Sequence, residues 1–519
     1  MTDASIALNR FGLGARPGED PGKDARQWLL GQIERFEPRP QGIAALPPST
    51  RVAADLAEYY EQTRMLRQEN GGKRRQATPR PAAARPPMAQ DANMQGAAMQ
   101  DMAAGAQMQE GAPAKTRKDG IDRNDPLAQA RRFARRQAQD YYVGAVNARA
   151  LAAINSPTPF AERLVHFWAN HFAVSADKLQ VIGLVGTLEF EAIRPHIMGK
   201  FGDMLHAVER HPAMLIYLDQ AQSIGPNSMA GQIAQRRGNG QRAGLNENLA
   251  REIMELHTLG VRTVYTQADV TEFARAMTGW TVNGLGRARA ARFTGTDGET
   301  GTYVFAERLH EPGTRTILGK SWGEAGEKQA SDVLDYLATH PATAKHIATK
   351  LARHFAGDDP PAPVVARLEK AYLSSGGHLP TVYRALIASP ECWAPQPLKF
   401  KSPWEWSISA MRALGTTQLQ PQVATGLLNQ LGQPVWKPGS PAGWDDVAGA
   451  WAGPDAIMRR VEAAERMAAR TRDTIDARQR AAQLFPGALS DSTAQSIARA
   501  ESPGQGIALM LVAPEFMRR

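Results

Sequence analysis

Apolar residues recur at helical spacing along most of the chain, and this pattern limits the fold more than any other feature. Leu29, Ile33 and Phe36 form one such stripe near the N-terminus, and Val52 and Leu56 begin another. A stripe that repeats every three to four residues buries one face of an α-helix, whereas a half-buried strand requires alternation with period two. Period-two alternation is scarce, so we predict a mainly α fold.

Helices are predicted wherever the helical pattern is continuous. After the first sixty residues they span 126–151, 158–174, 186–196, 211–218, 246–259, 267–279, 327–357, 364–375, 380–388, 402–414 and 454–483, with a last pair near 490–512. The first of these begins with Asp125-Pro126, a helix-start signal with proline at the first helical position. Only 302–305 and 314–318 alternate as strands do, and we predict that they pair as one small hairpin.

The composition changes abruptly between residues 68 and 125, where Ala, Gln, Pro, Gly and Met dominate. Such a segment buries too little apolar area to offset the entropy cost of ordering it. We therefore predict a long disordered insertion at 68–125 in a large single multi-helix domain. The domain would comprise N-terminal helices at 1–67, a helical core at 126–400 and a C-terminal helical part at 401–519. The methionines of the insertion could bind Cu(I) through their thioether sulfurs, or they are simply tolerated in a low-complexity loop. They are Met88, Met94, Met99, Met102 and Met108.

The sequence does not predict a membrane span, a secretory signal or a disulfide bond. No uninterrupted apolar run reaches about eighteen residues, so we predict no transmembrane helix. The segment 1–12 lacks the regions of a secretory signal, which predicts a cytoplasmic protein unless a leader has been removed. The single cysteine, Cys392, permits no internal disulfide and no multi-cysteine metal site.

Basic residues are in excess, with 61 Lys and Arg against 52 Asp and Glu. Part of this excess lies in 73–136, and such a segment can contact nucleic acid or an anionic membrane. However, no aromatic residues interleave with these charges, and no RNA-binding motif or helix-turn-helix signature stands beside them. We predict a solvated face with a flexible basic loop, and no nucleic-acid partner.

The segment 163–175 concentrates polar and aromatic residues within two helical turns. His166 and Asn170 are four residues apart and share a helix face. His166 and His171 diverge by about 140° on a regular helix. The two histidines can therefore bind one ion together only if the helix ends or bends between them.

The second motif, 246–260, is predicted as a helix capped by its first residue and stopped by its final glycine. Glu247, Arg251 and Glu255 recur every four residues, which places an arginine between two carboxylates on one face. His257 points about 200° around the helix from Glu255. The motif therefore does not direct all of its ligand-type side chains to one point.

Together the two segments resemble the DUF1800 family, helical bacterial proteins of unknown function. The resemblance is carried by Trp-Ala-Asn-His-Phe at 168–172, by the Asn-Glu-Asn…Arg-Glu…Glu-Leu-His-Thr-Leu-Gly element at 246–260 and by Thr-Gly-Trp at 278–280. Further matches are Leu309-His310-Glu311 (with Glu where the family commonly has Asp), Lys350-Leu351, Lys401-Ser-Pro-Trp-Glu405 and Gly443-Trp444. The resemblance covers about residues 5–517. It implies a helical fold and supplies no confirmed catalytic residue.

A metal or haem site is the sharper chemical hypothesis for these motifs. Facing helices in bundles bind mono- and di-iron centres through carboxylates and imidazoles. The candidate ligands for iron, zinc or copper are His166, His171, Glu252, Glu255, His257 and His310. Haem against His171 is a related version, with Trp168 and Asn170 as candidate cofactor-binding residues, and Glu247 and Arg251 are candidate catalytic residues. The spacing lacks both Glu-x-x-His and His-Glu-x-x-His, which counts against a ferritin-like or zincin site.

Two functions from different classes follow. One is a metal- or haem-dependent enzyme, most naturally a redox enzyme, with a His/Glu site between helices. The other is a non-catalytic binding or assembly protein, for which the family's genomic pairing suggests a DUF1501-type partner. In the second case the same motifs form a structural polar network, with Arg251 as the centre of an ion-pair ladder and the histidines bonded to backbone carbonyls.

Overall fold

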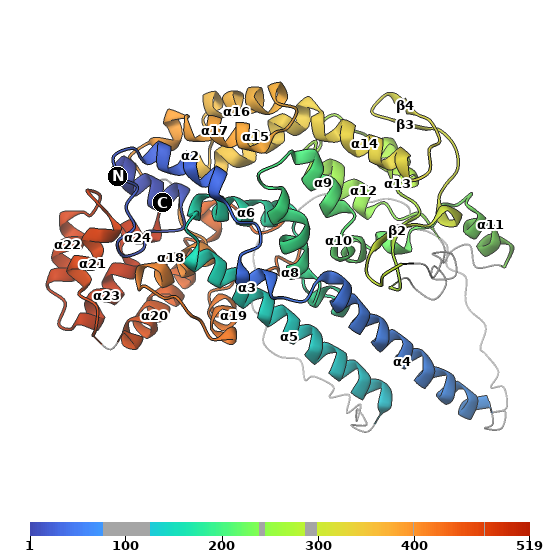
Figure 1. Ribbon diagram of the computed structural model, residues 1–519, viewed down its shortest axis with the longest axis horizontal. Helices are drawn as coiled ribbons and strands as arrows, with labels where there is room; N and C mark the ends of the chain where they lie inside the picture. The colour runs from blue at the N-terminus through green and yellow to red at the C-terminus, as the bar shows by residue number, and fades with distance from the viewer. Residues whose placement is uncertain (76–124, 238–243, 286–297, 398, 472) are drawn as a thin grey trace, which may run out of the picture. The chain divides into compact units, whose positions relative to one another are not determined.

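The computed structural model describes residues 1–75, 125–237, 244–285, 298–397, 399–471 and 473–519 (Figure 1). The chain divides into two compact units, Met1–Ala57 with Ala134–Arg519, and Glu58–Phe133. The α-helices of the N-terminal half are α1 (Asp3–Ile6), α2 (Ala25–Arg35), α3 (Gln41–Ala44), α4 (Ser49–Arg75), α5 (Pro126–Asn155), α6 (Pro159–His171), α7 (Leu179–Ile182), α8 (Val185–Thr187), α9 (Phe201–Glu209), α10 (Pro212–Tyr217), α11 (Met229–Arg236) and α12 (Asn248–Glu252). Those that follow are α13 (Gln267–Ala276), α14 (Glu327–Thr339), α15 (Pro341–Ala356), α16 (Ala362–Ser374), α17 (Leu379–Ile387), α18 (Pro403–Ala413), α19 (Pro421–Gln430), α20 (Pro454–Arg470), α21 (Ala477–Leu484), α22 (Asp491–Ala498), α23 (Pro503–Val512) and α24 (Pro514–Met517).

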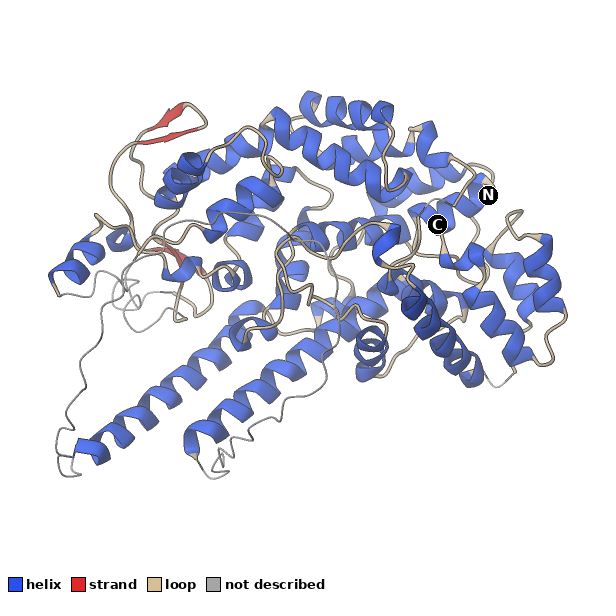
Figure 2. Ribbon diagram, turned by 180° about the vertical axis from the view of Figure 1, so that it is seen from behind, coloured by secondary structure: helices blue, strands red, loops and turns tan. Residues whose placement is uncertain are grey.

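Shorter helical turns connect these helices. The 3₁₀ turns are η3 (Arg194–His196), η4 (Gln220–Gln222), η7 (Glu307–Leu309), η8 (Pro390–Trp393) and η9 (Ala448–Ala450), and the π-helical turns are η1 (Ala7–Phe11), η2 (Leu188–Ile193) and η6 (Ile253–His257). Helices dominate the described chain, with two short strand pairs beside them (Figure 2). The predicted mainly α fold is confirmed.

Two segments that the apolar pattern predicted as single helices are each divided into two. The segment 327–357 forms α14 and α15. Pro341 starts the second helix, because a proline disfavours α geometry in the residue before it. His340 caps the new helix by accepting a hydrogen bond from the backbone N–H of Ala342. The segment 454–483 separates into α20 and α21 without a proline between them, and Asp476 is the N-cap of the second helix.

The predicted hairpin between 302–305 and 314–318 is wrong, since each strand has another partner. Strand β2 (Tyr303–Phe305) pairs with β1 (Trp280–Val282), and β3 (Arg315–Ile317) pairs with β4 (Lys320–Trp322). Leu318 and Gly319 both have positive φ, as a two-residue type I′ turn requires. This tight turn joins β3 directly to β4, so β3 pairs with the next strand along the chain and not with β2.

The predicted insertion falls mainly outside the described residues. The described helix α4 continues past residue 67 to Arg75, and α5 begins at Pro126 as predicted. The remaining insertion residues, with all of the methionines considered for Cu(I), lie outside the described chain. None of the described helices is both long enough and apolar enough to cross a bilayer.

The core of the larger unit joins parts of the chain that are far apart in sequence. Leu8 and Ala15 pack in one cluster with Trp406 of α18 and with buried residues of α20 to α24. The segment around Lys399 also pairs with the last residue, since the backbone N–H of each of Lys399 and Arg519 donates to the carbonyl of the other. This arrangement brings the start of α18 against α6 and α15, where the candidate site lies.

Candidate functional site

Helix α6 supplies one wall of the candidate site. Pro159 occupies its first position, where the missing N–H costs no hydrogen bond. Arg163, His166 and Asn170 follow at intervals of three and four residues and therefore share one face. All three line the same cavity.

The cavity has a volume of about 120 Å³. This corresponds to on the order of four water molecules, so it suits a ligand of few heavy atoms. Its wall includes residues from α5, α6, α15, the start of α18 and the segment 433–446. The lining side chains used below are Arg149, Arg163, His166, Asn170, His171, Lys350, His354, Trp404, Glu405, Trp436, Trp444, Asp445 and Asp446.

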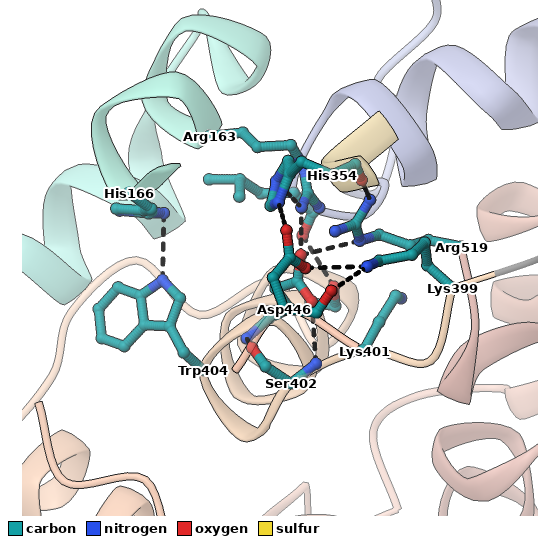
Figure 3. Close-up of polar contacts among 12 residues, drawn as sticks. Arg163, His166, His354, Lys399, Lys401, Ser402, Trp404, Asp446 and Arg519 are labelled. Carbon is teal, nitrogen blue, oxygen red and sulfur yellow. Dashed lines mark hydrogen bonds and ion pairs between the residues drawn. The ribbon is translucent and has the colours of Figure 1, made fainter. Parts of the chain in front are cut away.

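Glu405 anchors a buried network of charges beside the cavity, and Figure 3 shows its partners Arg163 and Arg519. Its position is set by a capping box, in which Ser402 accepts from the backbone N–H of Glu405 and Glu405 accepts from that of Ser402. The carboxylate pairs with the guanidinium of Arg163 and, at 2.8 Å, with Nε of Arg519. These cations lower the pKa of Glu405 well below its usual range, although burial opposes this shift.

His354 and Asp446 form a second pair beside this network (Figure 3). Nδ1 of His354 lies 2.8 Å from the Asp446 carboxylate, and Nε2 lies 3.4 Å from Nη1 of Arg163. Lys399 binds the other carboxylate oxygen of Asp446 at 3.0 Å. Burial lowers the pKa of His354 to about 4, so near neutral pH its Nδ1–H donates to Asp446 and its Nε2 accepts from Arg163.

Arg149 and two tryptophans form another part of the wall. The Arg149 guanidinium lies 4.1 Å from the ring centroid of Trp404 and 5.3 Å from that of Trp436. Its charge is balanced by Glu189, at 2.7 Å from Nε. The stacked guanidinium and rings give this side of the cavity a flat, largely apolar surface.

His166 presents an N–H group that no described residue accepts. The indole N–H of Trp404 donates to Nδ1 of His166 at 3.1 Å, and since an indole only donates, the imidazole proton is on Nε2. Nε2 lies 3.7 Å from Glu162, beyond hydrogen-bonding distance, and is buried without a partner among the described residues. Burial and the charges of Arg149 and other arginines hold the pKa of His166 well below its usual range.

Lys350 approaches the cavity from α15. Its Nζ lies 3.0 Å from Nδ1 of His171, and it forms no ion pair with any carboxylate of the described chain. Nε2 of His171 lies 3.0 Å from the carbonyl oxygen of His257. A carbonyl only accepts, so Nε2 carries the proton of His171 and Nδ1 is the acceptor for Lys350.

Asn170 fixes the loop at Trp444, which also lines the cavity. Its amide donates to the carbonyl of Trp444 at 2.8 Å and accepts from the Trp444 backbone N–H at 2.7 Å. The neighbouring Gly443 has φ of +81°, and a Cβ there would lie 2.4 Å from the carbonyl oxygen of Asn170. This close approach accounts for the Gly-Trp step of the sequence.

The DUF1800 family model, described as a protein of unknown function, matches residues 6–518. The chain belongs to the DUF1800 family. No curated protein and no solved structure matches this DUF1800 chain. The resemblance inferred from the two motifs is thereby confirmed, and it covers both of them together with the cavity.

The second DUF1800 motif does not form one regular helix. Helix α12 ends at Glu252, and the chain continues as the π-helical turn η6 over Ile253–His257. The predicted start at Asn246 is also wrong: the first helical residue is Asn248, whose N–H donates to the Asn246 side chain at 2.9 Å. Because a π turn uses i→i+5 bonds, the angles predicted for an α-helix do not apply to His257.

The candidate catalytic residues of this motif lie on a partly exposed face. Arg251 Nη2 binds Glu247 at 2.9 Å, and the side chains are 37% and 29% exposed. Arg251 also donates to Gln267 rather than to Glu255. The ion-pair ladder through Arg251 is therefore reduced to one pair, and neither residue lines the cavity.

The candidate metal ligands are distributed over separate environments. His257 is buried against Glu209, with Nδ1 2.7 Å from the carboxylate, whereas Glu252 is half-buried and burial raises its pKa. Glu255 interacts with Tyr265. His310 lies elsewhere, its Nδ1 2.9 Å from the carbonyl oxygen of Thr278.

Within the described residues, no three or more His, Cys, Asp or Glu side chains are grouped so as to hold a metal ion. His166 and His171 line the same cavity but have different partners, as their divergence on the helix predicted. Trp168 is buried in the core, where its indole donates to the hydroxyl of Tyr383 at 2.7 Å. The sequence-predicted set thus contributes His166, Asn170 and His171 to the cavity.

Sequence reasoning missed several cavity residues: Arg149, Arg163, Lys350, His354, Trp404, Glu405, Trp436 and Asp446. A signal was present for two groups of them. Lys350-Leu351 and Lys401–Glu405 belong to the family resemblance, and the latter contains a Ser-x-x-Glu capping box. No local pattern indicated Asp446, whose partner His354 is 92 residues away in sequence.

Proposed function

We propose that this DUF1800 protein binds a small organic anion, of the carboxylate class, in the cavity between α6, α15 and the start of α18. One observation carries the proposal. Among the cavity-lining residues, two buried side-chain polar atoms lack a hydrogen-bond partner in the described structure, and both are N–H donors: Nη2 of Arg163 and Nε2 of His166.

An unpaired buried donor is energetically costly. Leaving a buried donor unsatisfied costs about 1–3 kcal/mol, and more when the group is charged. The side chains of Arg163 and His166 are only 2% and 9% exposed, so bulk water does not readily offset that cost. An acceptor from outside the chain would relieve both, and a carboxylate offers two oxygens with several lone pairs.

The charges around the cavity also favour an anion over a cation. Burial and the surrounding arginines lower the pKa of His166 and keep it neutral, and Lys350 adds a cation without a bonded carboxylate. The carboxylates of Glu405 and Asp446 are already engaged by Arg163, Arg519, His354 and Lys399. Asp445, which also lines the cavity, is exposed to solvent.

Calorimetric titration with acetate, pyruvate, glycerol and ammonium tests this proposal. We expect saturable binding of the two carboxylates and none of the neutral or cationic probes. His166→Phe should weaken acetate binding by about tenfold or more, since one donor to a charged acceptor contributes about 1.5–3 kcal/mol. The matched control is His206→Phe, on α9 outside the cavity, where the histidine pairs with the exposed Asp335.

Two results would overturn the proposal. One is that no carboxylate probe shows saturable binding to the wild-type protein. The other is that His206→Phe weakens acetate binding as much as His166→Phe does. In either case the two donors are better explained as sites for internal water.

The metal- or haem-dependent enzyme predicted from the motifs has less support from the described geometry. Both ring nitrogens of His171 already have partners, and the other predicted ligands are dispersed. Metal analysis together with an absorption spectrum of purified protein tests this alternative. A stoichiometric metal or haem that disappears in His171→Ala without unfolding would favour it over the anion site.

A role as a binding or assembly protein with a DUF1501-type partner stays a prediction. It rests on the family's genomic pairing. The test is co-purification of such a partner, with an unchanged complex when the predicted ligands are replaced by neutral residues.

A further inference from the structure

We propose that Lys350 forms an iminium bond with the carbonyl carbon of a small oxo acid whose carboxylate is held by Arg163 and His166. This inference rests on the proposed anion site. It adds a covalent step and narrows the ligand from carboxylates in general to those with an adjacent aldehyde or ketone group.

The placement of Lys350 is the first support. It lines the cavity from α15, one helical turn before His354, and His354 contacts Arg163 at 3.4 Å. The lysine therefore lies near the guanidinium proposed to hold the carboxylate. A ligand with its carboxylate on Arg163 and a carbonyl next to it would direct that carbonyl towards α15.

Lys350 lacks the counter-ion that holds the buried Lys399. Lys399 is held by Asp358 at 2.9 Å and by Asp446 at 3.0 Å. The buried Lys401 has no such partner either, but it does not line the cavity. The only side-chain partner of Lys350 in the described chain is Nδ1 of His171. A lysine fixed in an ion pair is a poor nucleophile, whereas one bonded only to a neutral imidazole can release a proton and attack.

His171 acts as a positioning residue in this scheme. Its Nε2–H is committed to the carbonyl oxygen of His257, so Nδ1 stays an acceptor and holds one N–H of Lys350. When Lys350 is a free amine, that hydrogen bond occupies one proton and leaves the lone pair free to point elsewhere. The amine is thereby oriented for attack on a carbonyl carbon in the cavity.

The electrostatic surroundings favour the free amine. Burial lowers the pKa of Lys350 to about 8; the charge of Arg353 adds to this effect and Asp446 opposes it. His171 and the neighbouring His346 are both largely neutral, since burial and the charge of Lys350 lower their pKa values. A substantial fraction of nucleophilic amine is then present slightly above neutral pH.

The reaction balances without a further reactant. The Lys350 ammonium first releases a proton, and the amine lone pair forms a C–N bond to the carbonyl carbon. The carbonyl oxygen, protonated twice, then leaves as water while the C=N bond forms. Overall, an ammonium and a carbonyl give an iminium and one water, with no change in oxidation state.

Borohydride trapping in the presence of pyruvate tests the inference on the full-length protein. Borohydride reduces an iminium to a stable secondary amine, so Lys350 should gain the mass of pyruvic acid less one oxygen atom. We expect one adduct per chain, mapped to Lys350 by peptide mass spectrometry. Lys350→Arg should abolish it, while Lys345→Arg, an exposed lysine on the same helix, should leave it unchanged.

The outcomes separate this inference from the proposed function. If acetate and pyruvate bind saturably but no adduct forms on Lys350, or if it forms on the buried Lys401 instead, the iminium is refuted and the anion site stands. If neither probe binds, the proposed function is refuted, and the iminium proposal is refuted as well because it depends on the anion site. A site-specific adduct on Lys350 that acetate suppresses by competition supports both.

The positioning role of His171 has its own readout. His171→Phe should lower the trapping rate at saturating pyruvate by about tenfold or more while the acetate dissociation constant stays within about twofold. A variant that merely loosens the fold would weaken acetate binding as well. An unchanged trapping rate in His171→Phe would refute the role assigned to the hydrogen bond.

Discussion

Replacing Glu405 by glutamine tests whether the buried charge network holds the cavity in place. The carboxylate pairs with Arg163 and Arg519, and its side chain is 11% exposed. Glutamine keeps the size of the side chain but removes the charge, leaving two buried guanidinium groups without their counter-ion. Removal of one member of a buried ion pair typically costs about 3–5 kcal/mol.

That cost converts into a measurable change in melting temperature. Unfolding entropy amounts to about 2.1 cal/mol/K per residue, so a single transition of all 519 residues has about 1.1 kcal/mol/K. A loss of about 4 kcal/mol then lowers Tm by about 4 °C. The matched control is Glu462→Gln, which breaks a 4.0 Å pair with Arg466 between side chains about half exposed; it should shift Tm by about 0.5 °C or less.

The pH dependence of the difference adds a second check. Because the folded pKa of Glu405 is depressed, its charge contributes stability above the unfolded value of about 4.3 and loses it as pH falls towards the folded value. Scanning calorimetry should show the full gap between wild type and Glu405→Gln at pH 7 and a smaller gap below about pH 4. A variant that melts with the control at pH 7, or a gap that widens in acid, would refute the ion-pair account.

Three further predictions concern other parts of the site. Gly443→Ala should lower stability by about 2 kcal/mol or more in thermal melts because of its positive φ and the contact with Asn170, whereas Gly439→Ala, also at positive φ but with nothing within 4 Å, should show only the backbone strain. The initial rate of pyruvate trapping should rise with pH through a midpoint near 8, since Lys350 loses its proton there; a pH-independent rate would contradict this. Arg251→Ala should leave acetate affinity unchanged in calorimetry and cost about 1 kcal/mol or less, because its ion pair with Glu247 is partly exposed.

Local patterns predicted which way the side chains of α6 point. Pro159 and the apolar spacing placed the helix, and the divergence of His166 and His171 followed from the angle per residue. The structure has that divergence, with His166 bonded to Trp404 and His171 to Lys350. Regular helices can be treated in this way because their geometry repeats.

The partners of those side chains were beyond the reach of local patterns. Arg163 and Glu405 are 242 residues apart, and periodicity gives only a facing direction, never a partner across the fold. The side-chain directions predicted for the second motif are wrong for another reason. The π turn at Ile253–His257 departs from the α-helical repeat on which those directions were based. Such turns cannot be derived from apolar spacing, so the angle predicted between Glu255 and His257 does not apply.

The arrangement of charge around the cavity argues that its donors await an external acceptor. A purely structural network is stable when each buried donor is satisfied within the chain, and most of this one is. Glu405 and Asp446 together engage Arg163, Arg519, His354 and Lys399. Among the side chains that line the cavity, the buried polar atoms without a hydrogen-bond partner in the described structure are an N–H of Arg163 and an N–H of His166, and Lys350 nearby has no bonded carboxylate. Chance defects in packing would leave donors and acceptors alike, whereas donors alone on side chains around one small cavity are the complement of an anion.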